Sequence, residues 1–250
     1  MAVERGNEPV DFLDRIKARF TFLVEQNRLA EEEVQVVSAR PLTPEEAIGS
    51  PDRRDFPLLK GKEVMIQAAF RGDLGQAYTD QPGNYRGPLS EVLALPLRNN
   101  FQRAVLIAAL NAVLRHLKLV DKTIHCRDHE PALCAGRLAE YVRERFGNPR
   151  IAFIGLQPAM VESLAAHFAI RVTDLDPDNV GQRRCGVLIE DAQRNEEVLS
   201  WGEIVLATGS TAVNGSLQAL VGRKPVVFYG VTVAGVARLA GLEQYCYCGH

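Results

Sequence analysis

The sequence predicts an α/β protein in which an α+β first half precedes a second half built on a parallel sheet. The main observation is the stretch 150–179, where an apolar strand, a turn and a helical segment lead into a second strand. This order predicts a βαβ unit, whose two strands run parallel. Apolar strands at 203–208 and 225–230 alternate with short helical segments and extend the same pattern.

The first half mixes helical and strand patterns without a βαβ order. The predicted elements are helices at 10–29, 43–49 and 100–117, strands at 33–39, 63–70 and 76–79, and loops at 50–62 and 80–88. The strand at 76–79 follows a glycine turn, so we expect it to pair antiparallel with the strand before it. The helix at 100–117 is apolar nearly all round, which predicts burial against several neighbours.

A connector at 120–131 has no apolar period and separates the two patterns. We therefore predict two domains, at 1–122 and 123–250. Pro131 suits the first turn of the helix that follows, because proline lacks the N–H that this position leaves unpaired, and Gly147 ends that helix.

Composition and charge narrow the function classes. The chain has 250 residues, 46% hydrophobic and 24% charged, with a formal charge of -2. No basic face is expected, so nucleic acid is not a predicted partner. The longest apolar run, 104–114, is too short to span a bilayer, so we expect no membrane partner. A homo-oligomer is compatible with the sequence.

Cysteine usage bears on the compartment. The N-terminus has no apolar signal core, and the chain has five cysteines. Cysteines without a signal peptide favour the reducing cytoplasm, where thiols stay free or bind metal. We therefore expect a cytoplasmic protein.

Turn-forming and polar residues follow the first two strands of the second half, where the ligands of parallel sheets bind. They are Gly155, Gln157 and Pro158 after the first strand, and Asp174 and Asp176 after the second. A single glycine and a proline do not match the G-x-G-x-x-G fingerprint, which argues against an ordinary nicotinamide cofactor. Another nucleotide-like or small anionic ligand remains the prediction here. The alternative is that the acidic loop is only a turn.

Two later strand ends add small and hydroxyl residues at the same predicted edge. They are Gly209, Ser210, Thr211 and Asn214 in GSTAVNG, and Gly230 and Thr232 in GVTVAG. We predict that these loops line a ligand site. Capping of the next helix by Asn214 is the alternative interpretation of the first loop.

Metal-ligand residue types gather in two places. The connector carries His125, Cys126, Asp128, His129, Glu130 and Cys134, and the C-terminus carries Cys246, Cys248 and His250. Thiolate, imidazole and carboxylate suit zinc or a softer transition metal, so a divalent transition metal is the cofactor that these residues suggest. Neither cluster has the C-x-x-C pair that is typical of structural zinc sites. Capping of the following helix is the alternative role of Asp128.

Five stretches together resemble a known family. They are TIHCRDHEP, RAVLIAALNAVL, DLDPDN, ATGSTAVNGSL and VVFYGVTVAG. The chain resembles the two-domain "putative heavy-metal chelation" proteins, a family of unknown function. The resemblance implies an N-terminal α+β domain similar to the N-terminal domain of enolases, then a variant Rossmann-like domain, with a cleft between them.

The family's motifs fall on the residues already singled out. Its HC-x-D-x-EP connector falls on His125, Cys126, Asp128, Glu130 and Pro131, its acidic motif on Asp174 and Asp176, and its GST-x-x-N-G loop on 209–215. The resemblance implies metal handling or metallocofactor synthesis, without establishing an activity.

The leading hypothesis is a protein that binds a metal ion or a metal-carrying small molecule in the interdomain cleft. One alternative is a Rossmann-like transferase with a nucleoside cofactor such as S-adenosylmethionine, whose ribose Asp174 or Asp176 would bind. Another is a non-catalytic small-molecule carrier. The sequence does not decide whether the protein is an enzyme.

Overall fold

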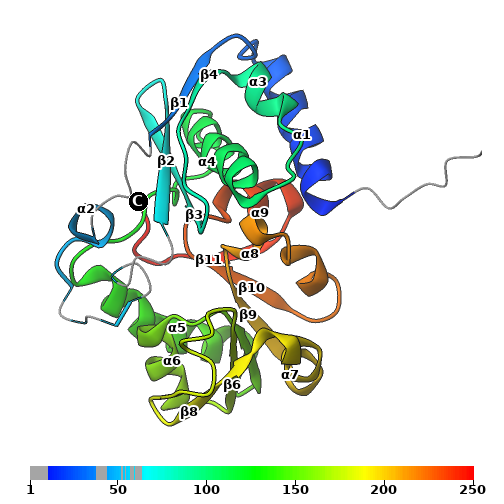
Figure 1. The fold of residues 1–250 in the computed structure, drawn as a ribbon. Helices are drawn as coiled ribbons and strands as arrows, with labels where there is room; N and C mark the ends of the chain where they lie inside the picture. The colour runs from blue at the N-terminus through cyan, green and yellow to red at the C-terminus, as the bar shows by residue number, and fades with distance from the viewer. Residues whose placement is uncertain (1–10, 38–43, 52, 54, 57–58, 60–63) are drawn as a thin grey trace, which may run out of the picture.

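The computed structural model describes residues 11–37, 44–51, 53, 55–56, 59 and 64–250 (Figure 1). The elements of the first half are α1 (Phe12–Gln26), β1 (Glu33–Val37), α2 (Pro44–Ile48), β2 (Val64–Phe70), β3 (Asp73–Thr79), β4 (Tyr85–Pro88), α3 (Leu89–Ala94) and α4 (Asn100–His116). Thr43, the predicted start of the second helix, and much of the predicted loop at 50–62 lie outside the described residues.

The second half continues the alternation of strands and helices. Its elements are α5 (Glu130–Phe146), β5 (Ile151–Ile154), α6 (Pro158–Ala165), β6 (Ile170–Asp174), β7 (Arg183–Arg184), β8 (Val187–Asp191), η2 (Ala192–Arg194), α7 (Asn195–Trp201), β9 (Ile204–Thr208), α8 (Thr211–Asn214), η3 (Leu217–Leu220), β10 (Val226–Tyr229), α9 (Ala234–Ala240) and β11 (Glu243–Tyr245). The predicted α/β class is confirmed.

The first half forms a four-stranded antiparallel sheet in the order β3-β2-β1-β4. The antiparallel pairing of β3 with β2 is confirmed, although β3 begins at Asp73. The two strands join through Arg71 and Gly72, both at positive φ, as the tight turns that match strand twist require. The predicted loop at 80–88 is partly wrong, because Tyr85–Pro88 pairs with β1. This short edge strand lacks the apolar alternation that would have predicted it.

The second half forms a seven-stranded sheet in the order β11-β10-β9-β5-β6-β8-β7. All neighbours are parallel except β7, which pairs antiparallel with β8. Numbered along the chain, the parallel strands run 3-2-1-4-5-6, the order of doubly wound dinucleotide-binding sheets. The order reverses between β5 and β9, so the carboxyl ends of these two strands form the crevice where such sheets bind ligands.

Three elements differ from the sequence prediction. The region 182–200 holds α7 after β8, and α3 follows β4 directly. The segment after α9, for which no strand is predicted, contains β11, the sixth parallel strand. Each of these pieces is short, and a short segment presents too few residues to establish a period.

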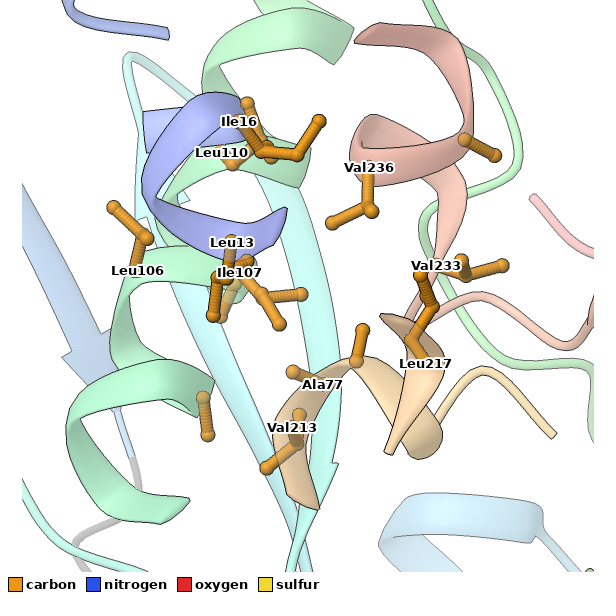
Figure 2. Packing of buried hydrophobic residues seen from close by; sticks show 14 of the residues in the cluster. Leu13, Ile16, Ala77, Leu106, Ile107, Leu110, Val213, Leu217, Val233 and Val236 are labelled. Carbon is orange, nitrogen blue, oxygen red and sulfur yellow. The ribbon is translucent and has the colours of Figure 1, made fainter. Parts of the chain in front are cut away.

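Helix α4 packs against both halves of the molecule (Figure 2). Its residues from Ala104 to Leu114 are fully buried, as predicted, and the apolar ones belong to a cluster that also holds Ala77 of β3, Val213 of α8 and Val236 of α9. Gly75 lets β3 lie directly on the helix, since a Cβ there would be 2.3 Å from the Ala112 nitrogen. None of the helices in the described ranges is long and apolar enough to cross a membrane.

Asn111 is the polar exception inside α4, and its side chain is fully buried. Its Nδ2 donates to the carbonyl oxygens of Gln76, Val231 and Thr232 at 2.9–3.2 Å, and its Oδ1 accepts from the Gly235 N–H at 2.8 Å. These bonds join β3 to the segment between β10 and α9. The two sheets therefore share one core, and the predicted division at residue 122 stays a prediction.

Helices cover both faces of the parallel sheet (Figure 1). Phe153, Leu206 and Val227 pack in one cluster with residues of α5 and α6. Their strand neighbours Ala152 and Val205 point to the opposite face and join the cluster of α4. This alternation follows from the two-residue period of a strand.

Candidate functional site

A cavity of about 490 Å³ lies at the carboxyl ends of the central parallel strands. The loops after β5, β6, β9 and β10 form one side of it. The end of β3 with Tyr78 and Asp80, the helix start at Asn100, and the connector at His125 and Cys126 form the other. The site therefore lies where the doubly wound sheet meets the antiparallel sheet.

The structure brings most of the predicted residues together at this cavity. From the ligand-binding prediction, the lining contains Gly155, Gln157, Asp174, Asp176, Gly209, Ser210, Thr211, Asn214, Gly230 and Thr232. From the metal-ligand residue types, it contains His125, Cys126, Cys134 and Cys246. Pro158, Asp128, Glu130, Cys248 and His250 are not among the lining residues. Ligand binding by any of these residues stays a prediction.

Asp174 connects the loops that follow β5 and β6. Its Oδ2 accepts from the Leu156 N–H at 2.6 Å, and its Oδ1 accepts from the Asp176 N–H at 2.8 Å and from Asn179 Nδ2 at 3.1 Å. Both carboxylate oxygens therefore already hold protein groups. Asp176 in turn accepts from the Asp178 N–H at 3.0 Å, a local turn contact of the kind expected for an acidic loop.

The first strand end is shaped by close backbone packing. Gly155 has φ 88°, and a Cβ there would lie 2.6 Å from Thr208 Cγ2, so only glycine fits between β5 and β9. The Tyr229 hydroxyl donates to the Gly155 carbonyl oxygen at 2.7 Å. Gln157 caps α6, because its Oε1 accepts from the Met160 N–H at 2.6 Å, and Pro158 follows in the first turn.

The GST loop is also held by its own hydrogen bonds. The buried Thr211 hydroxyl donates to the Thr208 carbonyl oxygen at 2.7 Å. Asn214 Oδ1 accepts from the N–H and the hydroxyl of Ser216 at 3.0 and 2.7 Å. Asn214 is the last residue of α8 and does not cap the next helix, because the N-cap of η3 is Ser216 without a side-chain bond. Ser210 is held more weakly, since its hydroxyl accepts from Thr208 at 3.3 Å.

Thr232 ties the loop after β10 to the antiparallel sheet. Its buried hydroxyl oxygen accepts from the Tyr78 N–H at 3.1 Å. Gly230, at φ 91°, donates its N–H to the Tyr245 carbonyl oxygen at 3.1 Å, which joins the same loop to β11. These contacts set the width of the cavity between the two sheets.

His125 is the least satisfied polar residue of the cavity wall. Its backbone N–H donates to Gln76 Oε1 at 2.7 Å, and its ring packs edge-on against Tyr78 with centroids 5.7 Å apart. Its Nδ1 is buried and has no hydrogen-bond partner within the described part of the chain. Burial lowers the pKa of His125 from 6.5 to about 4, so the imidazole is neutral near pH 7 and can act as a donor to a metal.

Asn179 provides a second unsatisfied atom on the other side of the cavity. Its Oδ1 is buried and also lacks a hydrogen-bond partner among the described residues. Buried polar atoms are nearly always hydrogen-bonded, so an orphan atom that lines a cavity points to a ligand or to water. Asn179 is the last residue of the DLDPDN motif, so this motif could have identified Asn179 as a candidate site residue.

The charged lining residues are all acidic. They are Asp80, Asp174 and Asp176, and the described lining contains no lysine or arginine. Asp80 accepts from Asn100 Nδ2 at 2.7 Å. Such a lining attracts cations and repels phosphates. The expectation of an anionic ligand therefore loses its physical support, whereas a cationic or neutral ligand suits the cavity.

The sequence did not single out the β3 side of the cavity. Tyr78 and Asp80 lie at the end of a strand of the first half, far from the other candidates in sequence. Only the packing of the two sheets brings them to the site. The strand-to-loop change after Thr79 was visible, but nothing local marked it as functional.

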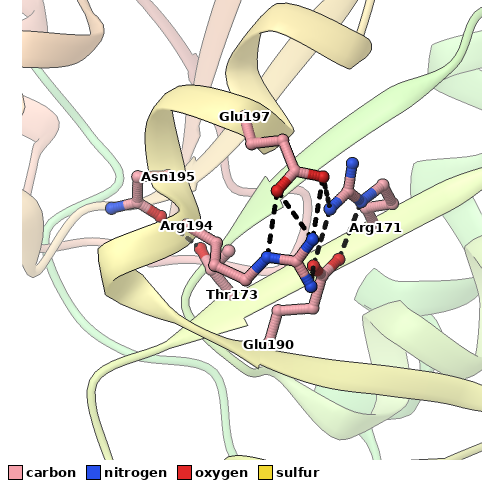
Figure 3. A network of polar contacts seen from close by, with 6 residues as sticks. All are labelled: Arg171, Thr173, Glu190, Arg194, Asn195 and Glu197. Carbon is pink, nitrogen blue, oxygen red and sulfur yellow. Dashed lines mark hydrogen bonds and ion pairs between the residues drawn. The ribbon is translucent and has the colours of Figure 1, made fainter.

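A polar network supports the wall at β6 and α7 (Figure 3). The Thr173 hydroxyl donates to Asn195 Oδ1 at 2.6 Å, and both residues line the cavity. Next to this pair, Arg171 binds Glu190 at 2.6 and 2.7 Å and Glu197 at 2.8 Å. The contacts of Arg171 in β6 with Glu190 in β8 and Glu197 in α7 hold α7 against the sheet.

Two of the predicted metal ligands have structural partners. Asp128 Oδ1 accepts from the Ser50 N–H at 2.9 Å, and Asp128 does not cap α5, whose N-cap is His129 without a side-chain bond. Glu130 accepts from the Arg127 N–H at 2.8 Å, which lowers the pKa of its carboxyl, and His250 Nε2 lies 3.1 Å from both of its oxygens.

The C-terminal tail lies against the connector, so the two predicted metal clusters meet. The His250 backbone exchanges hydrogen bonds with Ile124 at 2.7 and 3.0 Å and accepts from the Thr123 N–H at 2.9 Å. Burial raises the pKa of Cys126, and the nearby Cys134, Cys246 and Cys248 raise it further. Burial likewise raises the pKa of Cys246 to about 12. Within the described ranges, no three His, Cys, Asp or Glu side chains are already arranged to hold a metal ion.

Fold and cavity define an α/β protein with a cavity at the switch point of a doubly wound sheet. Residues 138–241 match the family model described as "putative heavy-metal chelation", which confirms the resemblance over that segment. No curated protein matches the chain.

Two solved structures from the same family, both of proteins with unknown function, resemble the chain. The one from Pyrococcus horikoshii has 19% identity and a TM-score of 0.55, and covers 88% of this chain and 79% of that chain. The one from Desulfitobacterium hafniense DCB-2 has 14% identity and a TM-score of 0.49, and covers 71% and 73%. The first likeness shows a shared fold.

Proposed function

We propose that the protein binds a metal ion in the form of a metal-carrying small molecule, in the cavity between the two sheets. The observation that carries the proposal is the buried Nδ1 of His125 at the cavity wall, which has no hydrogen-bond partner in the described part of the chain. A neutral imidazole is the commonest metal ligand of proteins. The family description, heavy-metal chelation, agrees with this chemistry.

The cavity suits a metal complex better than a bare ion. Its volume of about 490 Å³ lies within the range of small-molecule sites. A bare ion needs three or more protein donors, and the described residues offer no such arranged group. A chelating molecule supplies most donors itself and needs one or two from the protein. His125 would supply one of them.

The charge of the lining sets the class of complex. Asp80, Asp174 and Asp176 favour a cationic or neutral complex over an anionic one. The apolar side chains of Ile48, Phe56 and Met160 in the same lining suit the organic part of a chelator. The protein would then act as a binder, a carrier or an enzyme of metallocofactor synthesis.

Titration with a neutral probe, Cu²⁺–iminodiacetate, tests the role of His125. Isothermal calorimetry should show one bound complex per chain, with affinity at least about tenfold weaker in His125→Ala, a loss of about 1.4 kcal/mol. His129→Ala is the matched control, because His129 is exposed and does not line the cavity. Equal affinities of the His125→Ala and His129→Ala proteins would remove His125 from the site.

A nucleoside cofactor such as S-adenosylmethionine is the second candidate. The cavity lies at the switch point where doubly wound sheets bind nucleotides. S-adenosylmethionine has a sulfonium cation and no phosphate, which suits an acidic lining. Asp174 gives less support, because both of its oxygens hold protein groups. Equilibrium dialysis against S-adenosylmethionine separates the candidates, since the first predicts no retention of the nucleoside.

A further inference from the structure

We propose that Asn179 is a specificity-determining residue of the cavity, whose Oδ1 accepts a hydrogen bond from a protonated amine of the ligand. The ligand class is then a metal chelate that carries an ammonium group apart from its metal. The chelate part of this class rests on the proposed function, whereas recognition of the amine at Asn179 does not depend on His125. Asn179 lies in the loop after β6 and His125 in the connector, so the two residues can contact different parts of one molecule.

The loop after β6 fixes the position of Asn179. The Asn179 backbone N–H donates to the Asp176 carbonyl oxygen at 2.9 Å, and its carbonyl oxygen accepts from the Gln182 N–H at 3.1 Å. Its side-chain Nδ2 donates to Asp174 Oδ1 at 3.1 Å, and the residue is only 4% exposed. Each polar group of Asn179 except Oδ1 therefore has a protein partner.

The contact with Asp174 also determines which way the amide of Asn179 points. Asp174 Oδ1 accepts from the Asp176 N–H at 2.8 Å as well, so this oxygen acts as an acceptor. A flipped amide would bring two acceptors together, which would repel each other. Asn179 Oδ1 is thus a buried acceptor that lines the cavity and has no partner within the described ranges. Such a group costs free energy until a donor reaches it.

The charges around Asn179 select the type of donor. Asp174 and Asp176 belong to the same loop and line the cavity, and the described lining contains no lysine or arginine. The amide of Asn179 lies between its own Oδ1 and Asp174, so a donor that binds Oδ1 lies close to the Asp174 carboxylate. A nearby carboxylate favours a cation, so an ammonium suits this position better than a neutral hydroxyl or amide.

This contact would make the cavity selective. An ammonium satisfies the buried acceptor, whereas an alkyl group in the same place excludes water and leaves the acceptor unpaired. Sites that hydrogen-bond a ligand in this way reject analogues that lack the donor. Leu175 of the same loop also lines the cavity and is 69% exposed, which suits the apolar stem of an alkylammonium group.

Paired Cu²⁺ chelates test the inference on the unmodified full-length chain. The probes are iminodiacetates whose nitrogen carries a pentyl, hexyl or octyl arm, and each arm is either plain or ends in an ammonium group. Isothermal calorimetry should show at least one ammonium arm that binds about tenfold or more tightly than its plain partner, as expected of a hydrogen bond to a charged group. Equal affinities at every arm length would overturn the inference and would mean that water satisfies Asn179 Oδ1.

Substitution of Asn179 separates this hydrogen bond from the general charge of the cavity. Asn179→Leu has a similar shape without the acceptor, so the preference for the ammonium arm should fall about fivefold or more, with the plain arm changed by less than about twofold. Asn195→Ala is the matched control, because Asn195 also lines the cavity but its Oδ1 accepts from the Thr173 hydroxyl at 2.6 Å (Figure 3). A preference that persists in Asn179→Leu would belong to the acidic residues alone and would overturn the role of Asn179.

A purely structural role of Asn179 would give a different result, because it would weaken both arms alike. That outcome would also overturn the inference. Circular dichroism checks that Asn179→Leu folds. If it does not fold, Asn179→Ser takes its place, since the shorter side chain withdraws the acceptor from the ligand.

The two proposals fail separately. His125→Ala should weaken binding of every chelate and leave the ratio between the two arms unchanged. If the ratio depends on Asn179 while His125→Ala has no effect, only the proposed role of His125 fails. If no chelate binds, hexylammonium without metal tests Asn179 directly. In amide NMR spectra it should shift the side-chain signal of Asn179, and no shift at millimolar concentration would overturn the inference.

Discussion

The strand-end loops and the connector with its tail line the same cavity, but they use their polar groups differently. Asp174, Gln157, Thr211 and Asn214 in the loops hold neighbouring N–H, carbonyl or hydroxyl groups of the loops themselves. The connector leaves His125 Nδ1 without a hydrogen-bond partner among the described residues, and the next residue, Cys126, is a free buried thiol. Apart from Asn179, the loops therefore shape the cavity, whereas the connector and tail offer unused donors.

Replacement of Asp174 by alanine should have the largest effect on stability. It leaves the Leu156 N–H and the Asp176 N–H without their acceptor, and hydrogen bonds to a charged group contribute about 1.5–3 kcal/mol each. We expect a loss of about 3 kcal/mol in the free energy of unfolding by urea. Asp178→Ala, at an exposed carboxylate of the same loop, is the control. A similar loss in both variants would mean that Asp174 does not organise the loops.

A pH titration of stability should identify His125 in metal-free protein. Its folded pKa of about 4 lies below the ordinary 6.5, so the unfolded chain takes up a proton that the folded chain does not. The stabilising contribution is therefore lost as the pH falls, by about 2 kcal/mol between pH 7 and pH 5.

The variant His125→Phe keeps an aromatic ring beside Tyr78 and removes the titration. Between pH 7 and pH 5, the free energy of unfolding by urea should fall by about 2 kcal/mol less in this variant than in the wild type. Parallel curves for the two proteins would show that the His125 imidazole is not buried as described.

Removal of the α6 cap should have a smaller effect. Gln157→Ala loses the acceptor for the Met160 N–H, and helix caps contribute about 1 kcal/mol. Thermal unfolding should report this loss, with the exposed Gln193→Ala as control. If Gln157→Ala instead weakened Cu²⁺–iminodiacetate binding at unchanged stability, the side chain would serve the ligand and not the helix.

Ser210→Ala should have the smallest effect on stability, within about 0.5 kcal/mol, because its hydroxyl accepts a long bond of 3.3 Å and is not deeply buried. Among the loop residues compared, the side chain of Ser210 is held least firmly by other protein groups, and in this respect it is most like His125 of the connector. A measurable loss of chelate affinity in this variant would extend the ligand-contacting part of the cavity to the GST loop.

Much of this arrangement was predictable. The patterns at 150–179 and 203–230 predicted parallel strands with their polar loops at one edge, and the structure places Asp174, Thr211 and Gly230 around one cavity. These predictions succeeded because strand and helix periods depend on neighbouring residues. The short strands β4 and β11 were missed, because their pairing partners, and not their own pattern, define them.

The residues alone therefore specify the α/β class, the position of the polar loops at the strand ends, and the chemical types available there. Tertiary packing decides which of those groups remain free. Asp174 meets the Leu156 N–H, 18 residues away, and the tail meets the connector across about half of the chain. A hydrogen bond depends on distance in space, which a local sequence pattern does not contain. For the same reason, the meeting of Cys126, Cys134 and Cys246 at one cavity was not visible in the sequence.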